Sequence, residues 1–220
     1  MAYWLLTTHL FAIFPICVFL WSWKRRRDHV SIFMLIKFIY AVFYSLLYHQ
    51  HHSLRENRIT TNNDYEKWAL LDGYNCSALI FSTVIYVCRV REPYVYILSF
   101  TIENIVLIFY LWYELVQNTL LTWYILLSCI VVAIVKWKTI WRYLLFYKCL
   151  CLMGVGSGIS ALIMYMIAYN SWSSDEIYKI YHSLWHCFIF TTAGFGALLR
   201  FSLDEKLYPI MNRRDQLDSI

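Results

Sequence analysis

Long apolar stretches alternate with short polar links along the whole chain. Seven stretches long enough to cross a bilayer can be marked, at residues 3–23, 30–49, 67–88, 94–113, 118–137, 142–168 and 178–200. A helix of about 20 residues crosses the roughly 30 Å hydrocarbon core of a membrane. The pattern therefore predicts an all-α membrane protein, with a seven-transmembrane helix bundle over residues 1–203 and a short tail over residues 204–220.

The composition leads to the same fold class. Of the 220 residues, 60% are hydrophobic and only 15% are charged. A soluble domain carries more charge, about 25% of its residues. The composition therefore excludes a soluble globular protein, and the short links leave no room for a separate soluble domain.

Basic residues gather on one side of the predicted bundle. Thirteen lie in its links and tail on that side: Lys24, Arg25, Arg26, Arg27, Arg89, Arg91, Lys136, Lys138, Arg142, Arg200, Lys206, Arg213 and Arg214. Four lie on the other side: Arg55, Arg58, Lys67 and Lys179. Because basic links are retained in the cytoplasm, the N-terminus is predicted outside and the tail cytoplasmic. The net charge of +5 follows from this topology and gives no indication of a nucleic-acid partner.

Two basic residues, Lys37 and Lys148, fall inside predicted helices. Their long side chains are expected to reach towards the basic side, so that the charged ends meet water. Glu103 lies near the middle of the fourth helix, where a carboxylate must be paired or protonated. A structural hydrogen bond is the favoured interpretation of Glu103.

Ionisable residues from three predicted helices fall at one depth near the outer side. His182 and His186 are four residues apart and therefore share one face of the last helix. His49 ends the second helix, and Asp72 lies just inside the start of the third. Since ionisable groups are costly inside a bilayer, a metal site shared by these helices is the simplest explanation.

Imidazoles and a carboxylate are ligands that suit zinc. Three histidines, His49, His182 and His186, would leave a fourth position open for water, as catalytic zinc sites do. Asp72 is then either a ligand or the group that holds the bound water as a base. Ser45 shares the helix face of His49, and either orients a ligand or substrate or bonds its own backbone.

Three further features keep alternatives open. His52 follows His49 by three residues and could replace it as a ligand. His9, in the first helix, is interpreted as an internal hydrogen-bonding group. Gly154 and Gly158 have the spacing that lets two helices approach closely, which predicts packing inside the bundle or, less favoured, a homodimer through the same face.

The motifs resemble those of the CREST superfamily of seven-helix membrane proteins, which includes alkaline ceramidases and the progestin and adiponectin receptors. Residues 45–49 (Ser-Leu-Leu-Tyr-His) resemble its Ser-x-x-x-His motif, Asp72 its third-helix aspartate, and residues 182–186 its His-x-x-x-His motif. Within the superfamily, Tyr48-His49 and His186-Cys187 look most like the transmembrane protein eight and myomaker branch. The tail over residues 204–220 departs from that branch, since it has no cysteine for lipidation.

The resemblance implies a function and a set of site residues. It implies zinc held by His49, His182 and His186, with Asp72 and Ser45 beside it. It also implies a plasma-membrane protein that promotes myoblast fusion, acting on membrane lipids and on a muscle fusion partner protein. The chemistry of the site itself favours a second hypothesis, a zinc-dependent hydrolase of an amide or ester bond in a membrane lipid. A ligand-sensing receptor with a structural zinc ranks third.

Overall fold

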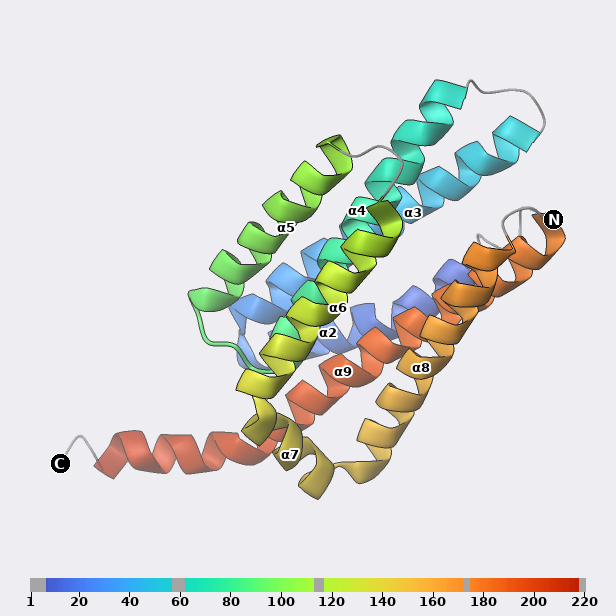
Figure 1. The fold of residues 1–220 in the computed structure, drawn as a ribbon. Helices are drawn as coiled ribbons and strands as arrows, with labels where there is room; N and C mark the ends of the chain where they lie inside the picture. The colour runs from blue at the N-terminus through green and yellow to red at the C-terminus, as the bar shows by residue number, and fades with distance from the viewer. Residues whose placement is uncertain (1–6, 57–61, 113–116, 172–174, 218–220) are drawn as a thin grey trace.

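The computed structural model describes residues 7–56, 62–112, 117–171 and 175–217, and the side chains of 7–52, 67–108, 124, 126–171 and 176–207. Every regular element in these ranges is a helix (Figure 1). In chain order they are a 3₁₀ helix η1 (Thr8–Ala12) and the α-helices α2 (Ile13–Arg26), α3 (His29–Glu56), α4 (Asn62–Val87), α5 (Tyr94–Trp112), α6 (Gln117–Val135), α7 (Trp137–Phe146), α8 (Lys148–Asn170) and α9 (Asp175–Leu217). The predicted all-α class is confirmed.

Four helices are long and apolar enough to cross a membrane, judged over the residues that the structure describes. They span His29–His52, Lys67–Val87, Lys148–Asn170 and Glu176–Leu207, and two shorter apolar helices cover Tyr94–Ile108 and Leu126–Val135. These helices support the predicted membrane character. Seven crossings, and the side on which each terminus lies, remain predictions.

Several helix boundaries differ from the sequence prediction, and two of the differences fall in the last third of the chain. The predicted segment 142–168 is divided at Tyr147, between α7 and α8. The last helix was expected to end at residue 200, but α9 continues to Leu217 and includes most of the predicted tail (Figure 1). Part of the reason lies at Asp204 and Glu205, which form ion pairs with arginines of α2 and hold this turn against the bundle.

Large apolar side chains cover much of the outer surface. On α8, the exposed members include Leu152, Val155, Ile159 and Leu162. In water such a surface would favour aggregation, whereas in a bilayer it faces lipid chains as apolar as itself. The exposed face of α8 therefore suits contact with lipid.

The core lies where α2, α3, α4 and α9 meet, with α5 against α4. Phe19, Met34, Phe38, Ile85 and Tyr86 are buried there almost completely. Aromatic edges join the helices, since the ring of Phe19 contacts both Phe38 and Tyr86. This packing fixes the rotation of each helix and hence the direction of its polar side chains.

Helix α9 packs along α8 through the glycines that the sequence singled out (Figure 1). A Cβ atom on Gly154 would lie 3.4 Å from Phe195, and one on Gly158 would lie 3.5 Å from Thr192, both on α9. The hydroxyl of Thr192 also donates a hydrogen bond to Ser157 at 2.9 Å. Gly154 and Gly158 thus serve packing inside the bundle, the favoured interpretation, and a homodimer through the same face remains a prediction.

Charged residues of four segments meet at the end of the bundle opposite the histidines. We call the six that pair there the ionic cluster: Arg26, Asp28, Arg89, Arg200, Asp204 and Glu205. Asp204 is 2.6 Å from Arg26 and 2.6 Å from Arg89. Arg200 donates to the backbone carbonyl of Tyr86 at 2.9 Å. The cluster joins α9 to α2 and α4, and to the residue before α3.

Lys37 has partners inside the bundle. Its ammonium group forms an ion pair with Glu103 on α5 and donates to the hydroxyl of Ser82 at 3.1 Å. Both charged side chains are largely buried, so pairing removes the cost of leaving each charge alone in an apolar layer. Glu103 thus has the structural role expected for it, with a lysine as its partner.

Candidate metal centre

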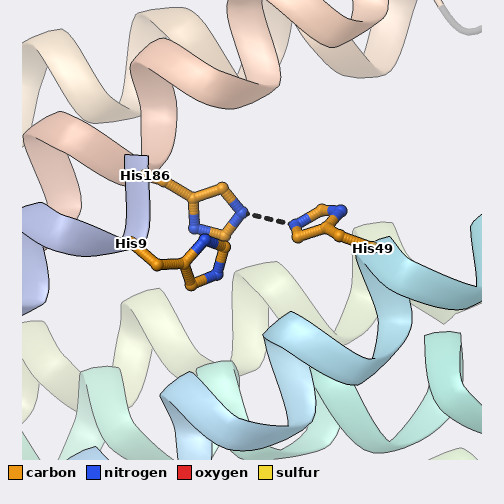
Figure 2. A group of neighbouring side chains, drawn as sticks. All are labelled: His9, His49 and His186. Carbon is orange, nitrogen blue, oxygen red and sulfur yellow. Dashed lines mark hydrogen bonds between the residues drawn. The ribbon is translucent and has the colours of Figure 1, made fainter. Parts of the chain in front are cut away.

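Four buried histidines form one cluster between η1, α3 and α9. We call His9, His49, His182 and His186 the histidine cluster. His186 is only 1% exposed, and its Nε2 lies 2.8 Å from Nε2 of His49 and 3.1 Å from Nε2 of His182. The ring of His9 lies 4.5 Å from that of His186, centre to centre, and Figure 2 shows His9, His49 and His186 turned towards one another.

The helices position these side chains in simple ways. His182 and His186 are one turn apart on α9, so both project from the same face towards α3. His49 lies near the end of α3 and points across to α9, where its ring is 5.0 Å from the ring of His182. His9 enters from η1, which packs against α9 at the start of the chain.

The cluster fits a metal ion. One ring nitrogen from each of His9, His49 and His186 lies within 4.8 Å of the other two. Two ligand nitrogens of a tetrahedral zinc, each bound at 2.0–2.1 Å, are about 3.3 Å apart. The Nε2–Nε2 distances of 2.8 and 3.1 Å around His186 are close to that value.

Hydrogen bonding alone does not satisfy the cluster. A neutral imidazole carries one N–H, and His186 Nε2 faces two other Nε2 atoms at once. The second nitrogen of His186, Nδ1, is buried without a hydrogen-bond partner. A cation between the rings would accept the lone pairs that otherwise face one another. The residues therefore fit a divalent metal that prefers imidazole.

Ser45 and Asp72 lie beside the histidine cluster, as the sequence predicted. The hydroxyl of Ser45 is 3.0 Å from Nε2 of His9 and lies close to the carboxyl group of Asp72. Asp72 is 6% exposed and accepts a further, weak hydrogen bond from the thiol of Cys76 at 3.5 Å. A short polar chain thus leads from the imidazole of His9 to a buried carboxylate on α4.

An apolar cavity of about 120 Å³ opens next to the cluster, between α3, α4 and α9. Ser45, Cys76 and His186 line one part of it, and residues such as Phe38, Ile80 and Ile189 line the rest. An apolar group in this cavity would contact the edge of the candidate metal centre. The cavity therefore suits a hydrocarbon chain better than a polar ligand.

The two other histidines of the second helix lie outside the cluster. His51 stacks on Trp68, with ring centres 5.4 Å apart. The ring of His52 lies 6.1 Å from the rings of Tyr48 and Tyr178. Neither belongs to the group of nitrogens that could hold a metal among the described residues. His49, which His52 was considered to replace, itself lies in the cluster.

His9 is the member of the cluster that the sequence analysis did not include. We interpreted it as a hydrogen-bonding group, which it is, since it contacts Ser45. Its place beside His49 and His186 depends on how η1 packs against α9, which no local pattern reveals. The available signal was a histidine within an apolar stretch, at an end of the chain that could reach the same layer.

Comparison with known proteins adds no relative. No family model matches the chain, and no curated protein or solved structure matches it significantly. The case for a metal centre therefore rests on the geometry of the four imidazoles, and the resemblance in the three motifs remains a prediction.

Proposed function

We propose that this chain is a plasma-membrane protein that promotes cell–cell fusion, with a zinc centre that clamps its helices. The observation that supports the proposal is the meeting of residues from three short motifs. Ser45 and His49 on α3, Asp72 on α4, and His182 and His186 on α9 lie in one network of contacts. These motifs are weak singly, and a shared site is what a relationship to the myomaker branch requires.

In this proposal the zinc is structural. His49, His182 and His186 would hold it, and thereby join α3 to α9 near the end opposite the ionic cluster. A structural metal contributes its binding free energy to folding, because the unfolded chain has no preformed site. The surface that meets the apposed membrane would then be kept in shape by the metal. Membrane lipids and a partner protein on the opposing muscle cell are the proposed partners.

A specific observation favours a second candidate, hydrolysis of a membrane lipid. The apolar cavity reaches His186 and Ser45, so a lipid chain within it would place its polar end near the metal. Zinc would supply a water of lowered pKa, near 7, as a nucleophile. Asp72 is buried beside the site and would hold or accept the proton of that water.

Cell mixing tests the first proposal. Two differently labelled fibroblast populations express the wild-type chain, His186→Ala or the control His29→Ala, and transfer of lipid and of contents is scored at matched surface levels. His29 is exposed at the start of α3, at the far end from the cluster, so its removal spares the centre. We expect transfer with wild type and with His29→Ala, in the presence of muscle cells if a partner is needed. Absence of transfer at full surface expression would contradict a fusion role.

Asp72→Asn separates the two candidates. Hydrolysis needs a carboxylate to handle the proton, so this substitution would abolish activity while metal content and surface level stay normal. A structural clamp instead predicts that fusion follows metal content, whatever the charge at residue 72. Normal activity of Asp72→Asn would therefore exclude the hydrolase.

A further inference from the structure

We propose that His9 is the fourth ligand of the metal, bound through Nδ1, and that Ser45 and Asp72 hold its ring in place. The ion is then surrounded by four imidazoles, from His9, His49, His182 and His186. Such a set leaves no position for water and pins the first helix to α3 and α9. The inference concerns the coordination of the site and stands independently of cell fusion.

The position of His9 is the first argument. One of its ring nitrogens is already within 4.8 Å of a ligand nitrogen on His49 and of one on His186. Tetrahedral coordination needs about 3.3 Å between ligand atoms, so a shift of roughly 1.5 Å or less would bring His9 to that distance from His49 and His186. His9 is 6% exposed, and its ring lies against His186 rather than towards the surface. His182 is not in this group of three, but its Nε2 lies 3.1 Å from Nε2 of His186, so a shift of its ring towards the other two histidines would complete the set of four.

The direction of the hydrogen bonds is the second argument. Nε2 of His9 lies 3.0 Å from the Ser45 hydroxyl, and the carboxyl group of Asp72 is close to the same hydroxyl. We assign the Nε2–H of His9 as the donor in the contact with Ser45, with the hydroxyl oxygen as its acceptor. A neutral imidazole protonated on Nε2 has its lone pair on Nδ1. His9 thus presents a metal-binding nitrogen at the atom that Ser45 leaves free.

The contacts from His9 through Ser45 to Asp72 resemble the surroundings of metal-binding histidines in other proteins. Such histidines almost always donate their second nitrogen to a carboxylate or another acceptor, which fixes the tautomer and the ring. Here Nε2 of His9 contacts the hydroxyl of Ser45 at 3.0 Å, and the buried carboxyl group of Asp72 lies close to Ser45. Ser45 and Asp72 are therefore positioning residues for a ligand, and neither needs to touch a substrate.

Coordination by four imidazoles has a chemical consequence. Structural zinc sites are closed by four protein ligands, whereas catalytic ones keep a position for water. A ligand from η1 closes the position that a site made of His49, His182 and His186 would leave open. The centre is thus suited to hold three segments together, which agrees with the structural role proposed for the metal.

The test is spectroscopy on the full-length protein purified in lipid nanodiscs. X-ray absorption at the zinc edge should show four imidazole nitrogens at about 2.0 Å in wild type and three with one oxygen in His9→Ala. After cobalt(II) substitution, azide should leave the visible spectrum of wild type unchanged and shift that of His9→Ala. His29→Ala, which removes a distant exposed histidine, should behave as wild type. A wild-type centre with a bound oxygen that azide displaces would overturn the proposal.

A second variant keeps the proposal testable if His9→Ala does not fold. Ser45→Ala removes the acceptor of His9 and should lower zinc affinity about 10- to 100-fold, the usual effect of losing such a partner. Ser99→Ala removes an equally buried serine on α5 and should leave the affinity unchanged. Equal affinities of Ser45→Ala and wild type would also overturn the proposal.

These results are separable from those of cell mixing. Four imidazoles in a protein that does not mix cells would uphold the coordination and reject the fusion role. Three imidazoles with water in a protein that does mix cells would do the reverse, and would favour the hydrolase candidate for the site.

Discussion

The two ends of this bundle hold polar residues in opposite ways. In the ionic cluster, three arginines meet three acidic residues, and Asp204 lies 2.6 Å from both Arg26 and Arg89. In the histidine cluster, four side chains of one kind meet, and Nε2 of His186 faces two further Nε2 atoms. The first group carries its own counter-charges. In the histidine cluster, a cation between the imidazoles would accept the nitrogen lone pairs that converge there.

This difference favours a structural role for the ionic cluster and a candidate binding site in the histidine cluster. Both clusters join α9 to other helices, and on α9 His186 and Arg200 are 14 residues apart, roughly 21 Å at 1.5 Å per residue. Opposite charges attract without any added component, so the ionic cluster is complete in the folded chain. A cation between the imidazoles would accept their converging lone pairs, so the histidine cluster could hold a metal ion.

The largest effect should come from breaking the ionic cluster. Arg200 contacts Asp28, Asp204 and the backbone carbonyl of Tyr86, and its side chain is 10% exposed. Arg200→Ala leaves two acidic groups short of a partner in a buried place. We expect a loss of about 3–5 kcal/mol in the free energy of unfolding. Thermal unfolding of the purified protein, with and without zinc, measures it.

Arg25→Ala is the matched control, because the side chain of Arg25 is 66% exposed and lies 4.0 Å from Glu205. An exposed pair of this kind contributes roughly 0–1 kcal/mol. The zinc-dependent part of the stability should survive in Arg200→Ala. Loss of zinc binding in that variant would show that the two ends are coupled, against the independence assumed above.

The second effect is the stabilisation that metal provides at the other end. Zinc at a free concentration about 100 times its dissociation constant should stabilise the wild type by roughly 2.7 kcal/mol, and a chelator should remove this gain. His49→Ala takes away one of the converging nitrogens, so zinc should raise its unfolding temperature less than that of the wild type. The same measurements on His29→Ala should match the wild type. A zinc effect as large in His49→Ala as in the wild type would place the metal elsewhere.

The ion pair between Lys37 and Glu103 can be compared with the two clusters. It is either complete without an added component, as the ionic cluster is, or needs one, as the histidine cluster is proposed to need a cation. If it is complete in itself, removing one partner is harmful and removing both is not. Glu103→Leu should therefore destabilise more than the double variant Glu103→Leu with Lys37→Met, with a coupling of about 1–2 kcal/mol. Zinc should change neither the destabilisation by Glu103→Leu nor the coupling energy. Additive effects of the two substitutions would argue against a structural pair.

The sequence predicted most of what periodicity and helix order control. Helix periodicity placed His182 with His186, and the alternating direction of the helices brought His49 and Asp72 to their level. The structure has these side chains in one network. Ser45 follows because it shares a helix face with His49. Such relations need only the helix geometry and the order of the segments.

The remaining features depend on how helices rotate and dock. His9 joins the cluster because η1 packs against α9, and a sequence pattern does not give the partner of a short helix. The arginines of the ionic cluster were interpreted as a topology signal alone, since pairing of Arg26 or Arg89 with Asp204 needs residues more than 100 positions apart. Lys37 finds Glu103 in the same way, through the packing of α3 on α4 and α5.

The smallest predicted effect concerns the segment of α9 between the two clusters. A Cβ atom on Gly196 would lie 2.9 Å from a methyl group of Val87 on α4, closer than side chains normally approach. Val87 is β-branched and stiff within its helix, so α9 itself must move away by a few tenths of an ångström. Gly196→Ala should cost about 1 kcal/mol of stability, at the low end for overpacked sites. Thermal unfolding in nanodiscs measures this cost.

Gly156→Ala on α8 is the control, because a Cβ atom there would meet nothing within 4 Å. Both substitutions change helix propensity alike, so the difference between them isolates the contact with Val87. Because α9 carries His186 towards one end and Arg200 towards the other, its displacement in Gly196→Ala should weaken zinc binding slightly as well as the ionic cluster. If zinc affinity stays unchanged while stability falls, α9 bends at Gly196 rather than moving as one body, and the two ends respond to it separately.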